Sequence, residues 1–176
     1  RAMNEDKADY ISTDAEYKSS LTSSIAEKEQ ALQAAKDKKI AADKAVKSAE
    51  NDLASAKSAQ VDAQTKLNAA QNAIAKAQKA YDDALAVKEQ TPAAQAKVVE
   101  TAKALETAKD ELATAKSNLA NLQQVRAQRE SELKNAKAKL VAQEEDLKQA
   151  LQVALDAEND LKAKGLATTE AKAQVE

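Results

Sequence analysis

Large apolar residues and alanines recur along most of the chain with a period of seven residues. From Ile25 to Lys88, every seventh residue is mostly large and apolar, and the residue three places later is mostly alanine. The same arrangement returns from Val98 to Leu161. In heptad notation the large residues occupy position a and the alanines position d. A strict repeat over about nine heptads predicts helices of a left-handed coiled coil.

One break separates the two repeats. Thr91 is a fair N-cap, and Pro92 suits the first position of a helix but not its interior. We therefore expect one helix to end near Gln90 and a second to begin at Pro92. A turn of two or three residues makes such helices antiparallel. The predicted fold class is all-α: a long antiparallel two-helix coiled-coil hairpin with its turn at Gln90–Pro92.

The position of the turn also predicts which residues face each other. With the turn centred on Thr91, facing residues have numbers that sum to 182. This register places Ala63 beside Leu119 and Ala77 beside Leu105. A large residue then faces a small one in almost every layer, which lets the helices approach closely while still filling space.

Polar and charged residues agree with this register. It brings opposite charges near each other across the helices, as in Lys66 with Glu111 and Lys36 with Glu144, and such pairs favour this pairing over a shifted one. Some polar residues interrupt the seam itself, where we expect them to fix the register while their long side chains reach water. These residues are Lys39, Gln60, Arg126, Arg129 and Gln143.

The two ends of the chain carry signals for helix boundaries. Thr13–Glu16 has the pattern of a capping box, and Ser24 begins a second candidate helix start. Gly165 follows lysines that favour a helix C-terminus. These signals divide the chain into an N-terminal segment (1–20), helix 1 (21–90), helix 2 (91–164) and a C-terminal linker or start of a further helix (165–176). A short third helix in the N-terminal segment, packed back on the hairpin, stays open as an alternative.

The composition excludes a compact globular domain. Of the 176 residues 43 are Ala, none is Phe or Trp, and there is one Gly and one Pro. Alanine buries too little apolar area to build a thick core, and an all-β protein needs more turn residues. The 27 basic and 29 acidic residues nearly cancel. This balance argues against disorder driven by net charge, and against nucleic acid or anionic membranes as main partners.

Residue types that carry catalysis or bind metals are scarce. The chain has no Cys and no His, so it lacks a nucleophilic thiol, a thiolate metal site and an imidazole base. Paired carboxylates such as Asp82 and Asp83 need a pocket to shift their pKa values, and a two-helix rod offers none. We therefore predict no enzyme activity, no catalytic, cofactor-binding or metal-binding residues, and no small-molecule substrate.

Two classes of targeting segment are also missing from the sequence. No apolar run approaches the ~18 residues of a membrane span, so no membrane insertion is expected. No signal peptide is recognisable, which indicates either a cytosolic protein or a fragment of a longer chain.

Among the large apolar residues outside the predicted seam, four lie at heptad positions b and e of the half of the hairpin near its open end. In the predicted register they follow one flank toward the open end of the hairpin, and exposed apolar patches often mark contact surfaces. We therefore predict a protein-contact flank formed by Ile40, Val141, Leu151 and Leu155. Three occupants remain: the N-terminal segment with Tyr10, Ile11 and Tyr17, a second copy of the chain, or a foreign protein. The first two are favoured over the third.

The stretch 20–163 repeats an L-x-x-A-K texture, as in Leu53–Lys57 and Leu112–Lys116. This texture resembles the Ala/Lys-rich helical regions of Gram-positive cell-wall-anchored surface proteins of the surface-exclusion, pneumococcal surface protein A or M-like type. The resemblance implies an extracellular protein, anchored through regions outside this fragment. It also implies a rod-like stalk or adhesin that gives reach or binds a host protein, as in virulence. The alternative is an intracellular coiled-coil arm of a tethering or chromosome-organising protein, although the nucleotide-binding G-x-x-x-x-G-K-[ST] motif of such proteins does not occur here.

Overall fold

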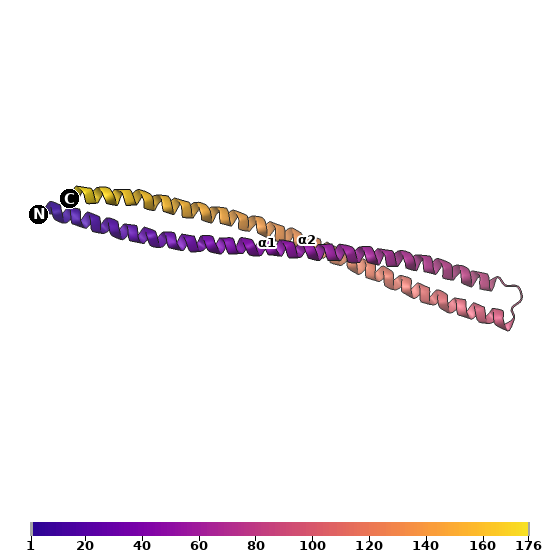
Figure 1. Cartoon of the computed structure of the whole chain (residues 1–176). Coiled ribbons are helices and arrows are strands. Elements are labelled where there is room, and N and C mark those ends of the chain that lie inside the picture. The colour runs from indigo at the N-terminus through magenta and orange to yellow at the C-terminus, as the bar shows by residue number, and fades with distance from the viewer. Residues whose placement is uncertain (1, 176) are drawn as a thin grey trace. The chain divides into compact units, whose positions relative to one another are not determined.

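The computed structural model describes the backbone of residues 2–175 and the side chains of residues 15–163. This part of the chain forms two α-helices, α1 (Ala2–Leu85) and α2 (Pro92–Val175). The helices pack against each other and run in opposite directions on either side of one turn (Figure 1). The prediction of an all-α antiparallel hairpin is confirmed.

Contacts within the chain define two units, and each contains a segment of both helices. The terminal unit consists of Arg1–Val46 and Ala136–Glu176, and the turn unit consists of Lys47–Asn135. The terminal unit is limited by Val46 and Ala136, and the turn unit by Lys47 and Asn135. In both cases the two residue numbers sum to 182. The division of the chain therefore follows the predicted register.

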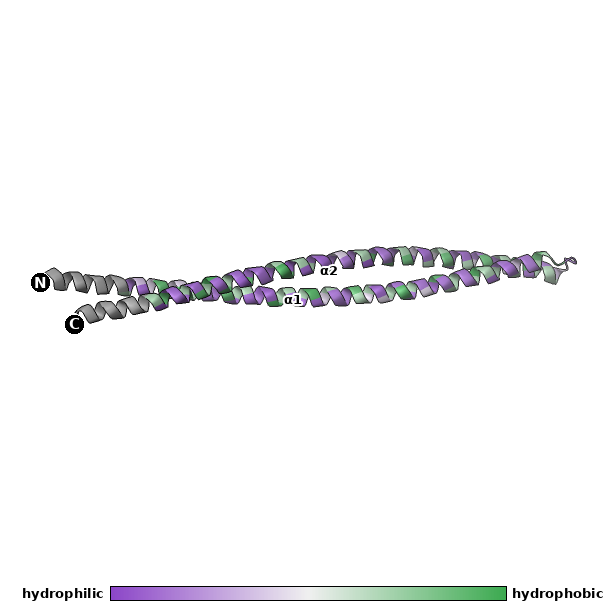
Figure 2. Cartoon of the chain, turned by 90° about the horizontal axis from the view of Figure 1, so that it is seen from above, coloured by the Kyte–Doolittle hydropathy of each residue, from purple (hydrophilic) through white to green (hydrophobic). Residues whose placement is uncertain are grey.

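The buried residues follow the heptad repeat without exception in the described side chains. All thirteen buried apolar residues, together with Thr101, lie at position a or d. Those at a are Ile25, Val46, Leu67, Leu105, Leu119 and Ala154, and those at d are Ala35, Ala42, Ala56, Ala63, Ala84, Ala108 and Ala157. In Figure 2, short bands of hydrophobic and hydrophilic residues alternate along both helices. Burial is thus set by a narrow stripe on each helix, as expected for two helices that share one seam.

The seam of the turn unit has a small core at its centre. Ala63 and Leu67 of α1 form a buried cluster with Leu119 of α2, and Leu112 packs against this cluster. Ala115 and Leu122 also pack against it. The predicted proximity of Ala63 and Leu119 is therefore confirmed.

The charged residues pair differently from the prediction. Each ion pair among the described side chains joins residues three or four apart on the same helix. Lys66 and Glu111 line the same groove, in line with the predicted register, but neither they nor Lys36 and Glu144 form an ion pair. The helix backbone already holds i,i+3 and i,i+4 side chains close together, whereas exposed pairs across a seam add little stability.

The turn is longer than predicted, because α1 ends at Leu85 rather than near Gln90. The N–H of Thr91 donates to the Glu89 carbonyl at 3.0 Å, and the Gln90 side-chain amide donates to the Val87 carbonyl at 2.6 Å. Residues 86–91 include no glycine and no residue with positive φ. This segment of six residues therefore reverses the chain without the left-handed backbone conformation that a glycine C-cap supplies.

The start of α2 agrees with the predicted capping. The Thr91 hydroxyl accepts a hydrogen bond from the Ala94 N–H at 3.1 Å, and the Thr91 carbonyl accepts one from the Gln95 N–H at 2.9 Å. Pro92 is the first residue of the helix. The N-cap and N1 assignments are confirmed.

Both helices extend past the boundaries predicted near the chain ends. α1 runs without a break through Thr13–Glu16 and Ser24, so the short third helix does not form and residues 2–20 belong to α1. α2 continues through Gly165 to Val175. Capping residues permit a boundary without forcing one, and a glycine inside a helix costs only about 1 kcal/mol. The side chains of Tyr10 and Ile11 lie outside the described residues, and Tyr17 is exposed on α1.

Candidate functional site

The predicted contact flank lies entirely within the terminal unit and is exposed to solvent. Ile40 on α1 has 52% of its surface exposed, and Val141, Leu151 and Leu155 on α2 have 65%, 46% and 45% exposed. These values are far above those of the seam residues, and no other part of the described chain covers the four side chains. The flank is available for contact with another molecule, and its use in binding remains a prediction.

The same positions of α2 also carry unpaired charges. Lys137, Glu144, Lys148 and Glu158 occupy b and e positions of the terminal unit, and all are exposed. Among the described side chains, none of these four makes an ion pair or a hydrogen bond. The apolar residues of α2 in the flank therefore alternate with charges that are free to meet a partner.

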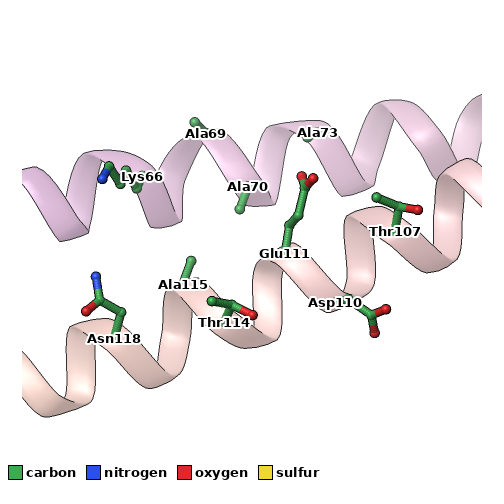
Figure 3. Close-up of a pocket in the computed structure, with 10 residues that line it drawn as sticks. All are labelled: Lys66, Ala69, Ala70, Ala73, Thr107, Asp110, Glu111, Thr114, Ala115 and Asn118. Atoms are coloured by element: carbon green, nitrogen blue, oxygen red, sulfur yellow. The ribbon is translucent and has the colours of Figure 1, made fainter.

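The turn unit contains an open groove that the sequence did not reveal (Figure 3). Its volume is about 780 Å³. α1 contributes Lys66, Ala69, Ala70 and Ala73, and α2 contributes Thr107, Asp110, Glu111, Thr114, Ala115 and Asn118. The alanines form a shallow apolar floor, and the polar side chains border it. The signal in the sequence was the spread of alanine beyond position d, at 69 and 73, which removes the side chains that would fill this side.

The charges around this groove do not converge on a point. In Figure 3 the Glu111 side chain extends from α2 toward α1 beside Ala70 and Ala73, while Asp110 points away from α1. Lys66 makes no ion pair with Glu111 among the described contacts. A groove with one cation and two carboxylates that do not act together suits contact with a polar protein surface better than a small ligand.

Polar residues interrupt the seam in both units, and their hydrogen-bonding groups find different partners in each. In the turn unit, Arg126 donates across the seam to Gln60 Oε1 at 3.2 Å and also pairs with Glu130 at 3.1 Å. The guanidinium of Arg129 pairs with Glu132 at 3.0 Å. Both arginines remain partly exposed, as predicted for long side chains that reach water.

The polar layer of the terminal unit has an unsatisfied atom. Lys39 pairs with Asp43 on its own helix at 3.1 Å. Gln143, which faces Lys39 in the predicted register, has a buried Oε1 without a hydrogen-bond partner. A hollow of about 270 Å³ nearby is lined by Lys38, Ala41, Ala42, Ala45, Lys139 and Gln143. A buried amide oxygen without a partner lowers the stability of this layer.

The described residues hold no group of His, Cys, Asp or Glu side chains arranged to bind a metal ion. The carboxylates Asp82 and Asp83 are both exposed, and Asp82 accepts a hydrogen bond from Gln78 at 3.0 Å. In the part of the chain that the structure describes, neither helix has a stretch apolar enough to span a membrane.

Comparisons with known proteins add no further constraint. No protein-family model, curated protein or solved structure significantly matches this chain. The resemblance to surface-protein stalks therefore stays a prediction that rests on the sequence texture alone.

Proposed function

We propose that this chain is a stalk segment of a bacterial surface protein, in which the hairpin gives reach to its turn and the outer faces of the helices offer protein contact. The observation that carries the proposal is a hairpin of two packed helices of 84 residues each. With a rise of 1.5 Å per residue, each helix has roughly 126 Å of axial length. Nearly all residues of the chain lie in two long helices that share one narrow seam. Such a chain is suited to a role that needs length.

The alanine seam supports the same function. Eight of the thirteen buried apolar residues are alanines, so the helices are held together along a thin stripe and not around a core. A thin seam leaves most of each helix surface in contact with solvent and therefore open to partners. The extracellular location in the proposal comes from the L-x-x-A-K texture that resembles Gram-positive surface proteins.

Surface labelling tests the location. Lys76 is exposed, and the chain has no cysteine, so a Lys76→Cys substitution introduces a single reactive thiol into this segment. In a parent protein with no other cysteine, a membrane-impermeant maleimide should label position 76 on intact cells as efficiently as after lysis. Labelling only after lysis would contradict the proposal and support the alternative, an intracellular tethering arm.

Matched shortening tests the spacer role. Deleting residues 50–56 together with 126–132 removes one heptad from each helix and keeps facing residues at their partners. A fluorophore attached to a Lys88→Cys substitution in the turn should move closer to the wall by about 10 Å, the axial length of seven residues, as measured by its separation from a fluorophore at the wall. Deleting residues 50–56 alone is the control, because it removes the same length from one helix but destroys the register. A turn whose distance from the wall is unchanged by the matched deletion would rule out this role.

A further inference from the structure

The outward face of α2 carries a pattern that is complementary to itself. We define the outer face of α2 as its b and e positions between residues 137 and 158. In order, these are Lys137, Val141, Glu144, Lys148, Leu151, Leu155 and Glu158. All seven are exposed. Positions b and e are three residues apart, as a and d are, so this face has the spacing of a second coiled-coil seam.

Two copies of this face match when they run antiparallel. In an antiparallel pair each b residue faces an e residue of the other copy, and one alignment gives partners whose numbers sum to 292. Val141 then faces Leu151 of the other copy, and Glu144 faces Lys148. In the outer layer Lys137 faces Leu155, whose apolar surface the lysine stem can cover. Each layer therefore pairs two apolar residues, two opposite charges, or the apolar stem of a lysine with a leucine.

Other alignments of the same face are poor. A slip of one heptad in one direction places Lys148 opposite Lys137. A slip in the other direction places Val141 opposite Glu158 and Leu155 opposite Glu144. A parallel arrangement in register places Glu144 and Lys148 opposite their own copies. Because like charges and buried charges are unfavourable, the antiparallel alignment is favoured over these three.

We propose that two copies of the chain associate through the outer face of α2, antiparallel, about a two-fold axis level with residue 146. The partner is a second copy because the face supplies both members of each pair, as a two-fold interface requires. Three apolar residues per copy are fewer than a standard interface contains, so the dimer is weak and salt-sensitive. The association does not depend on the stalk proposal, since an intracellular arm with this face would dimerise in the same way.

Charge reversal gives the first test, by sedimentation of the purified chain at concentrations up to about 1 mM, a range that covers weak interfaces. The wild-type chain should dimerise with increasing concentration. Glu144→Lys and Lys148→Glu should each raise the dissociation constant about tenfold or more, because each creates two like-charge pairs in the dimer. The double variant restores opposite charges between copies and should recover most of the affinity.

A matched control sits on another surface of the molecule. Lys79 and Asp83 have the same i,i+4 spacing at positions f and c of α1, and both are exposed. Lys79→Asp and Asp83→Lys should leave the dissociation constant unchanged. A chain that stays monomeric up to 1 mM would overturn the proposal. A double variant no better than the single ones, with helicity intact, would overturn it as well.

Cysteine crosslinking tests the alignment itself. A mixture of Val141→Cys and Leu151→Cys chains should form a disulfide between the two kinds of chain under mild oxidation. Val141→Cys chains alone should not, because two residues 141 lie about ten residues, or 15 Å, apart along the axis. Crosslinking of Val141→Cys alone at the same rate would contradict the alignment.

Discussion

Leucines occupy opposite environments on two surfaces of the molecule. In the seam of the turn unit, Leu67 and Leu119 have 9% and 8% of their surface exposed to solvent. On the outer face in the terminal unit, Leu151 and Leu155 have 46% and 45% exposed. The residue type is the same, and the difference is the heptad position. Leu67 and Leu119 at position a are buried in the hairpin, whereas Leu151 at e and Leu155 at b remain exposed.

The first prediction concerns the free energy of unfolding on the two surfaces. Leu119→Ala should lower it by about 2–4 kcal/mol, because the substitution leaves a cavity in the cluster with Ala63 and Leu67. Leu155→Ala, on the exposed flank, should change it by less than about 0.5 kcal/mol in the monomer. Urea unfolding followed by circular dichroism, at low protein concentration, measures both. Equal losses would mean that the seam is assigned to the wrong residues.

The second prediction concerns the unsatisfied layer of the terminal unit. Gln143→Leu should raise the free energy of unfolding by about 1–3 kcal/mol, since it removes a buried oxygen without a partner and keeps a similar volume. Gln149→Leu is the control, because Gln149 is exposed and donates only a long hydrogen bond, 3.5 Å, to Glu145. A loss of stability in Gln143→Leu would show that the amide makes a hydrogen bond in solution.

The third prediction concerns the cap of α2. Thr91→Ala should lower the free energy of unfolding by about 1 kcal/mol, because the Ala94 N–H loses its acceptor. Thr91→Ser keeps the hydroxyl and should lose clearly less. Hydrogen exchange of the Ala94 amide should accelerate in Thr91→Ala only. An unchanged exchange rate would mean that the hydroxyl does not cap the helix.

The fourth and smallest effect is expected for the hydrogen bond across the seam of the turn unit. A double-mutant cycle of Arg126→Met and Gln60→Leu should give a coupling of about 0.5–1 kcal/mol, because the guanidinium remains partly exposed. Repeating the cycle in 1 M salt should change it little, since Gln60 carries no charge. If the measured coupling is zero, this contact does not help to fix the register.

The sequence predicted the seam well and the helix ends poorly, for physical reasons. Burial follows from geometry, so a heptad repeat identified Leu67 and Leu119 without further information. Gly165 and Thr13–Glu16 carry boundary signals of only about 1 kcal/mol, which a long helix overrides. The length of the turn depends on backbone conformations that no single residue in 86–91 dictates.

The candidate surfaces were also predictable from the sequence only in part. The exposure of Ile40, Val141, Leu151 and Leu155 follows from their heptad positions and was predictable. The groove beside Ala69 and Ala73 was not, because alanine gives no sign by itself of whether a neighbouring side chain fills the space above it. The pairing of charges within each helix was also missed, since the register alone treats pairs across the seam as equal to pairs along a helix.

The hairpin register can be tested most directly with paired cysteines at positions 63 and 119. The chain contains no native cysteine, so any crosslink reports on this pair alone. With oxidation or a short bis-maleimide, Ala63→Cys/Leu119→Cys should crosslink within single chains at low concentration, whereas Ala63→Cys/Leu105→Cys should not. Crosslinks that form only between chains, or equally well in the second pair, would contradict the antiparallel hairpin and its register.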